Sequence, residues 1–112
     1  MLRRTLGNTE ISVTPVAMGC WPIAGVTSIN VTETESLSTL EAAAEAGINF
    51  FDTAYCYGYE GESERMIARA LGHRRDEIVI ATKGGIHWDT DASGKKNQAL
   101  APNGIIGIWS SV

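Results

Sequence analysis

Apolar residues in this chain gather in short runs and in two helical faces, with polar turns between them. Residues 3–6 and 11–13 flank Gly7-Asn8-Thr9, and this pattern predicts a β-hairpin, because Gly and Asn tolerate a positive φ. The apolar run over residues 16–19 predicts a short buried strand. This strand ends in Gly19-Cys20-Trp21-Pro22, which is typical of a loop.

Two stretches have the three- and four-residue spacing of amphipathic helices. The first begins at Thr32, where Glu35 completes a capping box, and it ends at Gly47. The second begins at Glu62 or Ser63 and ends at Gly72. The residues expected to face the core are Leu37, Leu40 and Ala44 in the first helix and Ile67, Ala70 and Leu71 in the second.

An apolar run follows each helix, which gives the chain an alternating order of strands and helices. Residues 48–51 predict one strand, and the β-branched run 78–82 predicts another that is buried and parallel. Residues 73–76 are a polar connector, and residues 89–97 are predicted to be a polar loop. Such alternation implies a parallel sheet with right-handed crossovers.

Composition limits the classes of protein to which the chain can belong. Its 112 residues allow one small domain, and 44% apolar with 20% charged residues argues against disorder. A net charge of −4 gives no electrostatic footprint for nucleic acid or an anionic membrane. No apolar run approaches the ~18 residues of a membrane span, and no apolar segment of a signal peptide follows Arg3-Arg4. We therefore expect a cytoplasmic protein.

The two cysteines, Cys20 and Cys56, are predicted to be separate thiols that are buried or half-buried. They form neither a disulfide framework nor a CxxC pair. No His or Cys partners stand at the spacings that zinc sites use, so we expect no metal site.

Candidate chemical groups stand at the carboxyl ends of the predicted strands, where parallel α/β folds bind ligands. Asp52 follows the second strand of the parallel sheet and Lys83 ends the third, so the two side chains can meet across adjacent strands. This ion pair could be purely structural, or it could be part of a site. Tyr57 lies in the loop after Asp52 and favours the second interpretation, because a phenol beside an ammonium is a better general acid.

Several motifs resemble the aldo-keto reductase family. Residues 51–64 resemble its Phe-Asp-Thr-Ala, Tyr-Gly and Ser-Glu signature, and Ile80-Ala81-Thr82-Lys83 resembles its third-strand lysine motif. Residues 6–9 and 16–21 are similar to its N-terminal hairpin and first strand. The agreement runs in the same order from about Arg3 to about Gly104.

The resemblance implies an α/β fold: the N-terminal part of a (β/α)8 TIM barrel, incomplete, with a β-hairpin and about three βα units. It further implies NADPH-dependent reduction of a small carbonyl substrate. In this role Tyr57 would donate the proton, Lys83 would make Tyr57 more acidic, and Asp52 would pair with Lys83. Gly19, Cys20 and Trp21, together with Asp52, would lie beside the cofactor.

The chain also departs from the family pattern. The family's fourth catalytic residue is a histidine after a fourth strand, and neither His87, in a predicted polar loop, nor His73, in the connector, matches it. A complete barrel needs ~250 residues. We therefore expect residues 1–104 to be part of a barrel that lacks full activity. Residues 105–112 are expected to be an aberrant tail that arises from a frameshift, a truncated gene or a sequencing error.

Two other functions fit the sequence. A non-catalytic fragment could bind a partner, or copies of itself, through exposed sheet edges and the apolar tail residues Ile105, Ile106, Ile108 and Trp109. A small flavodoxin-like binding domain fits the order of elements, but Gly19-Cys20-Trp21-Pro22 is not a glycine-rich phosphate loop.

Overall fold

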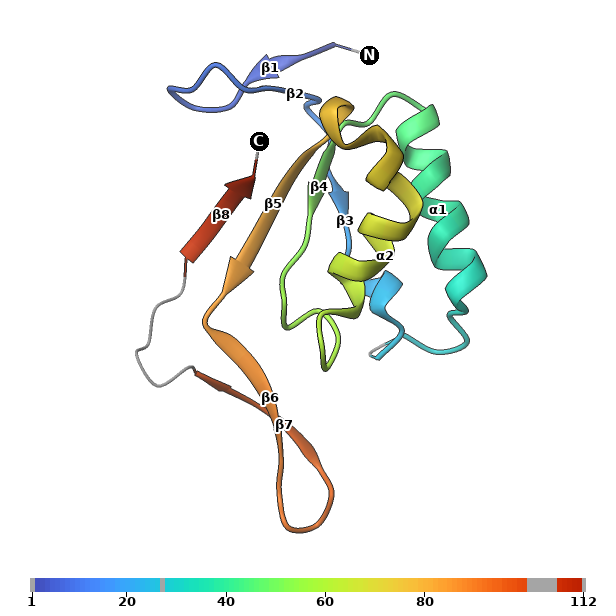
Figure 1. The fold of residues 1–112 in the computed structure, drawn as a ribbon, viewed down its shortest axis with the longest axis vertical. Coiled ribbons are helices and arrows are strands. Elements are labelled where there is room, and N and C mark those ends of the chain that lie inside the picture. Colours follow the sequence, from blue (N-terminus) through green and yellow to red (C-terminus); the bar gives the residue numbers. More distant parts are fainter. Residues whose placement is uncertain (1, 27, 101–106, 112) are drawn as a thin grey trace.

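The structure is a computed structural model that describes residues 2–26, 28–100 and 107–111 (Figure 1). Two short strands, β1 and β2, form an antiparallel hairpin that precedes the main sheet. The elements in chain order are β1 (Arg4–Thr5), β2 (Ser12–Val13), β3 (Met18–Gly19), η1 (Pro22–Ala24), α1 (Glu33–Glu45), β4 (Phe50–Asp52), α2 (Glu62–Leu71), η2 (Gly72–Glu77), β5 (Val79–Gly84), β6 (Ile86–Thr90), β7 (Lys96–Leu100) and β8 (Gly107–Ser111).

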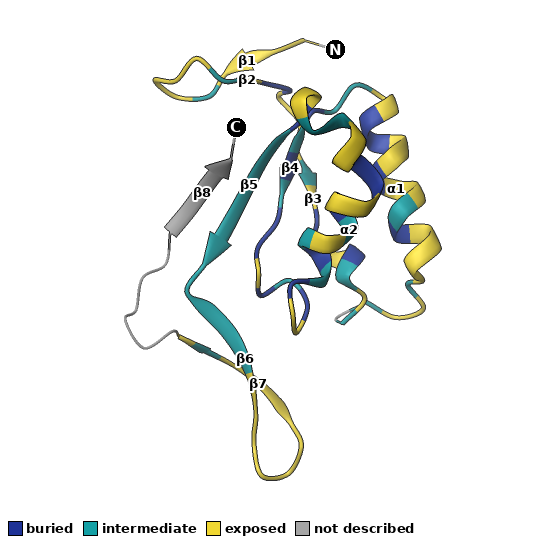
Figure 2. Ribbon diagram, viewed as in Figure 1, coloured by how far each residue is buried: buried dark blue, intermediate teal, exposed yellow. Residues whose placement is uncertain are grey.

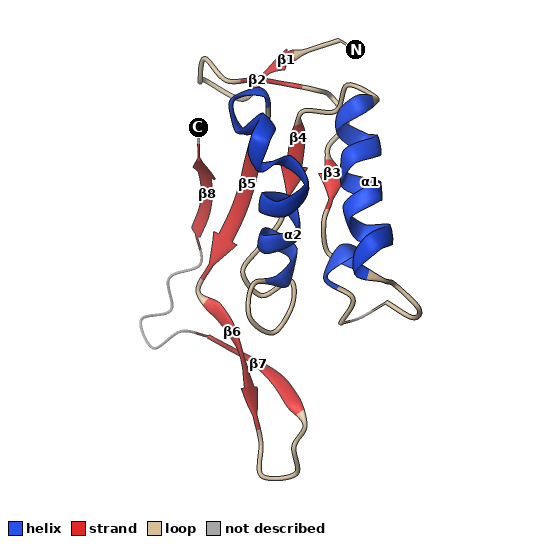
Figure 3. Cartoon of the chain, turned by 45° about the vertical axis from the view of Figure 1, so that its right-hand side comes forward, coloured by secondary structure: helices blue, strands red, loops and turns tan. Residues whose placement is uncertain are grey.

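The central sheet has the strand order β3-β4-β5-β8, and β3, β4 and β5 run parallel. The helices α1 and α2 lie side by side on one face of this sheet (Figure 3). Successive parallel strands joined by helices on a single face are the geometry of part of a (β/α)8 barrel. The α/β architecture and the predicted hairpin are therefore confirmed.

Both helices begin where the sequence predicts. The Thr32 hydroxyl accepts a hydrogen bond from the Glu35 amide, and the Glu35 carboxylate accepts one from the Thr32 amide, each at 3.2 Å, so the capping box is present. Gly47, with φ +99°, ends the turn after α1. Gly72 instead keeps right-handed helical angles. The predicted connector therefore continues from α2 as the 3-10 helix η2.

The hydrophobic core lies between the helices and the sheet (Figure 2). Phe51 points from β4 into this layer and is fully buried, as is Leu40 of α1. The predicted core faces of α1 and α2 are confirmed at the buried residues Leu40, Ala44, Ile67, Ala70 and Leu71. A single helix layer thus supplies the packing that holds the strand ends in place.

The prediction that residues 78–82 form a buried strand is wrong for most of its length. Ile78 is buried, but every residue of β5 is only half-buried. The reason is that the helices cover one face of the sheet, and no described element covers the other (Figure 2).

The prediction of a polar loop over residues 89–97 is also wrong. The strands β6 and β7 form an antiparallel hairpin that projects away from the sheet (Figure 1). Its turn is closed by the Asp91 carboxylate, which accepts hydrogen bonds from the amides of Ser93 and Lys95 at 2.9 and 3.0 Å, and by Gly94 at φ +86°. The expectation failed because residues 89–97 hold the polar turn and the exposed, polar ends of both strands, while the half-buried part of β6 lies before them, at residues 86–88.

The strand β8 pairs antiparallel with β5, and Ile80 aligns with Ser111. The predicted bare edge at β5 is therefore corrected, because backbone hydrogen bonds from β8 cover it. Residues 105, 106 and 112 of the predicted tail lie outside the described residues. Among the helices in the described part of the chain, none has the length and hydrophobicity of a membrane span.

Candidate active site

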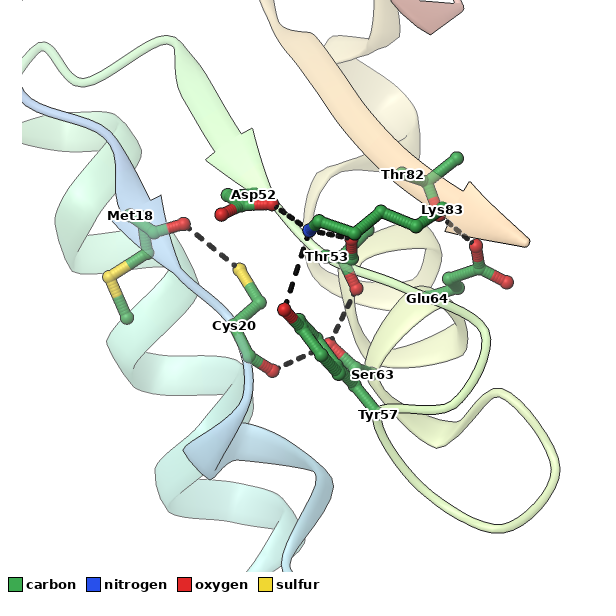
Figure 4. Close-up of polar contacts among 9 residues, drawn as sticks. All are labelled: Met18, Cys20, Asp52, Thr53, Tyr57, Ser63, Glu64, Thr82 and Lys83. Carbon is green, nitrogen blue, oxygen red and sulfur yellow. Dashed lines mark hydrogen bonds and ion pairs between the residues drawn. The ribbon is translucent and has the colours of Figure 1, made fainter. Parts of the chain in front are cut away.

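The three predicted catalytic side chains meet at the carboxyl end of the parallel sheet (Figure 4). Asp52 ends β4 and aligns with Ala81 of β5. Lys83 lies two residues beyond Ala81, and alternate residues of a strand share a face, so Lys83 extends across the end of β4 toward Asp52. Tyr57 reaches the same point from the loop that follows β4.

The Lys83 ammonium makes three hydrogen bonds. It forms an ion pair with Asp52 Oδ1, and it donates to the Thr53 carbonyl at 2.9 Å and to Tyr57 Oη at 3.3 Å. An ammonium has three N–H donors and no acceptor, so Tyr57 Oη must accept in this contact. The phenol proton of Tyr57 is therefore not used in its contact with Lys83.

The surroundings of Lys83 keep it charged. Partial burial alone would lower the pKa of Lys83, but the hydrogen bonds that Lys83 donates to Asp52 and Tyr57, together with the charge of Asp52, outweigh it, so this pKa lies above the usual value. The Lys83 Nζ atom also lies 5.0 Å from the centre of the Tyr57 ring. The site therefore presents a phenol next to a cation at neutral pH.

Trp21 forms the other wall of the site. Its ring meets the Tyr57 ring edge to face, with centroids 4.7 Å apart. Gly19 precedes it at the end of β3, where an added Cβ would find no atom within 4 Å. The space beside the reacting groups is therefore open on the Gly19 side and bounded by the Trp21 ring.

Cys20 lies in the predicted cofactor loop, but its thiol belongs to the core. Its side chain is fully buried, and burial, followed by the charge of Asp52, raises the pKa of this thiol to about 12. The Cys20 amide donates to the Asp52 carbonyl at 2.9 Å. Burial also raises the pKa of Cys56, and both cysteines are free and buried, as predicted. The backbone of Cys20 thus bonds the Gly19–Trp21 loop to the end of β4.

A buried pair of hydroxyls, which the sequence analysis missed, connects three parts of the site. Ser63, at the start of α2, donates to the Cys20 carbonyl at 2.7 Å, and the Thr53 hydroxyl lies 2.8 Å from the Ser63 hydroxyl (Figure 4). Because the Ser63 proton goes to Cys20, Thr53 must donate to Ser63. The pair joins β4, α2 and the Gly19–Trp21 loop. The Ser-Glu motif was a signal for Ser63, but its partners are distant in sequence.

Replacing Ser63 with alanine should lower the free energy of unfolding by about 1–3 kcal/mol, because a buried carbonyl and the Thr53 hydroxyl lose their partner. Urea denaturation followed by circular dichroism measures this change. The matched control is Ser38→Ala, since Ser38 is exposed on α1, and it should alter stability by less than about 0.5 kcal/mol. Equal effects of the two variants would contradict the role of the hydroxyl pair.

The remaining candidates lie away from the reacting groups. His87 belongs to β6 and sits 3.2 Å from the Asp89 carboxylate, and His73 is exposed in η2. In the described ranges, no three His, Cys, Asp or Glu side chains gather closely enough to hold a metal ion.

Comparisons with known proteins agree with this geometry. The model of the aldo/keto reductase family matches residues 15–107. The uncharacterized oxidoreductase YqkF of Bacillus subtilis (strain 168) is 35% identical over 94 residues, which cover 84% of this chain and 28% of that protein. The NADH-specific methylglyoxal reductase of Escherichia coli (strain K12) is 33% identical over 96 residues, 83% of this chain and 29% of that protein.

A solved structure shows the same fold. The aldo-keto reductase of Bacillus halodurans in its holo form superposes with a TM-score of 0.72 at 30% sequence identity. The match covers 91% of this chain and 31% of that protein. The chain therefore spans less than a third of the length of each of these three proteins.

Proposed function

This chain belongs to the aldo/keto reductase family, and from that premise we propose that it carries the proton-donor part of a carbonyl reductase site. The proposed reaction is the reduction of a small aldehyde or ketone to an alcohol. The observation that supports it most directly is the contact of the Lys83 ammonium with both Asp52 and Tyr57, at the sheet edge where such folds bind substrate.

In the proposed mechanism Tyr57 donates its proton to the carbonyl oxygen of the substrate. Lys83 already donates to Tyr57 Oη, so its positive charge stabilises the phenolate that remains. Asp52 and the Thr53 carbonyl hold the ammonium in place, so little reorganisation is needed when the charge develops. The three groups act as one unit in which only the phenol proton leaves.

A nicotinamide cofactor, when bound, would supply the hydride that reduces the carbonyl carbon. The described residues fit its reactive end: the backbone at Gly19 is open, Trp21 offers an aromatic wall, and Asp52 offers a carboxylate. The buried Cys20 would contribute only through the backbone. Lys83 is engaged by Asp52, Thr53 and Tyr57, so we do not assign it to the phosphates of the dinucleotide.

We extend the proposal to NADPH as the cofactor and to incomplete activity of the 112-residue chain. A hydride donor that is held only at one end is poorly oriented, and orientation contributes about 7–11 kcal/mol to lowering a barrier. The Escherichia coli relative is named for NADH, so the two nicotinamide cofactors need a direct comparison.

The test follows the loss of absorbance of NADPH, and separately NADH, with a simple aldehyde. Slow turnover by the chain that disappears in Tyr57→Phe would support the proposal. Absence of turnover from a monomeric, folded chain would overturn catalysis by these residues alone. Absence of turnover together with large assemblies on a sizing column would instead favour the alternative of a non-catalytic, self-associating fragment.

The ion pair should also give stability a characteristic pH dependence. The pKa of Lys83 is raised on folding, so its stabilising contribution is complete below the unfolded pKa of ~10.4 and is lost as pH rises through the folded pKa. We expect the difference in unfolding free energy between wild type and Lys83→Met to be constant near neutral pH and to shrink above pH ~10.4. The exposed Lys95→Met variant serves as the control. A difference that grows with pH would contradict the assignment.

A further inference from the structure

Trp88 of β6 contacts the loop that carries Tyr57, yet the proposed mechanism does not use it. Its indole Nε1–H donates to the Cys56 carbonyl at 2.8 Å. Its ring also meets the Tyr59 ring edge to face, with centroids 5.2 Å apart and an interplanar angle of 89°. Trp88 is half-buried, although it lies in a hairpin that is otherwise largely exposed.

These two contacts lie on either side of the proton donor. Cys56 directly precedes Tyr57, and Tyr59 follows it by two residues. The start of the loop is held separately, because the Tyr55 amide donates to the Lys83 carbonyl at 3.2 Å. At Tyr57 itself the amide donates to the Ala54 carbonyl at 3.1 Å, and the carbonyl accepts from the Ser63 amide at 3.0 Å. Trp88 adds a contact on each side of Tyr57 to these backbone bonds.

A short segment of chain connects Trp88 to Lys83, the residue that contacts Tyr57. Only Gly84 and Gly85 separate Lys83 from β6, and Gly85 has φ +96°. Lys83, at one end of this short segment, carries the ammonium. Trp88, at the other end, bonds to the backbone of Cys56 beside Tyr57. The distance of 3.3 Å between Lys83 Nζ and Tyr57 Oη is long for a hydrogen bond, so a small outward shift of the loop would break it.

We propose that Trp88 is a positioning residue that holds the Tyr57 loop against Lys83 through its indole N–H. This inference rests on the proposed function, because only that function gives the contact of Lys83 with Tyr57 a catalytic role. The contacts of Trp88 can be measured without turnover. Without the indole hydrogen bond, the loop would move away from β5, and the Tyr57 phenol would lose the cation.

The experiment uses Trp88→Phe in the 112-residue chain, which keeps a ring and removes the donor. The first readout is amide hydrogen exchange, expressed as the rate at Tyr57 divided by the rate at Val79. The Val79 amide donates to the carbonyl of the buried Asn49, far from the Tyr57 loop in the sequence, so the ratio corrects for any global loss of stability. The loss of one hydrogen bond should raise this ratio about three- to tenfold. Tyr59→Phe, which keeps both the ring and the indole bond, is the control and should leave the ratio unchanged.

The second readout is the titration of the Lys83 side chain by NMR, assigned with Lys83→Met. Tyr57→Phe should lower the Lys83 midpoint, because the Tyr57 hydrogen bond contributes to its elevation, and Trp88→Phe should shift it in the same direction. An unchanged midpoint would overturn the proposal even if the loop exchanges faster, and so would an unchanged exchange ratio. Neither readout requires turnover, so failure of the proposed activity would remain distinguishable from failure of this inference.

Discussion

Replacing Tyr57 with phenylalanine should lower the rate of carbonyl reduction about 10²- to 10⁴-fold, the range expected when a general acid is removed. The substitution deletes only the hydroxyl whose oxygen accepts from Lys83. The ring should keep its edge contact with Trp21, so binding of the carbonyl compound should change little. Steady-state NADPH oxidation should therefore show a fall in kcat with a nearly constant KM.

The neighbouring residues of the same loop offer a matched control. Tyr59→Phe removes a phenol hydroxyl two residues away, at a side chain that contacts Trp88 rather than Lys83. It should leave kcat within a factor of about two, since surface substitutions rarely alter the structure. If both variants retain full activity, Tyr57 is not the proton donor.

Replacing Phe51 with alanine should destabilise the chain by about 3–5 kcal/mol, the usual cost of removing a buried aromatic side chain. Phe51 has no exposed surface, lies on the central strand β4 and packs in the core that includes Leu40 and Ile67. The whole stability of a small domain is about 5–15 kcal/mol, so this single change should leave the chain largely unfolded in moderate urea. Circular dichroism during urea denaturation measures the effect.

The control for Phe51 is an apolar residue outside the core. Val16 is 59% exposed, and Val16→Ala should change the free energy of unfolding by less than about 0.5 kcal/mol. A Phe51→Ala variant as stable as Val16→Ala would mean that the helices do not pack on β4 in solution.

The sequence predicted best the features that depend only on residues close together in the chain. The Thr32–Glu35 capping box and the apolar faces of the two helices are decided within a few residues of chain, and each is present in the structure. The hairpin of β6 and β7 was missed because its turn and the β7 residues 96–98 are polar and resemble a loop. The alternation of Ile86 and Trp88 with His87 and Asp89 in β6 was not recognised as a strand. The burial of β5 was overestimated because burial depends on whether other elements cover both faces of the sheet, and the sequence of the strand alone does not show this.

Within the site, Asp52 and Lys83 could be paired from their positions at adjacent strand ends, and the structure shows the pair. The hydrogen bonds that hold the loops of the site in place could not be predicted in this way. Ser63 bonds to Cys20, 43 positions away, and Trp88 bonds to Cys56, 32 positions away. Such contacts depend on how helices and loops dock, whereas strand-end neighbours follow from the parallel order alone.

The antiparallel pairing of β8 with β5 has a kinetic consequence for any attempt to complete the barrel from a separate polypeptide. A parallel strand would need the same edge of β5 that β8 occupies over five aligned residue pairs. The incoming strand would have to wait until β8 dissociates. At high concentrations of the added polypeptide, the rate of assembly would therefore become independent of that concentration and would report the opening rate of β8 itself.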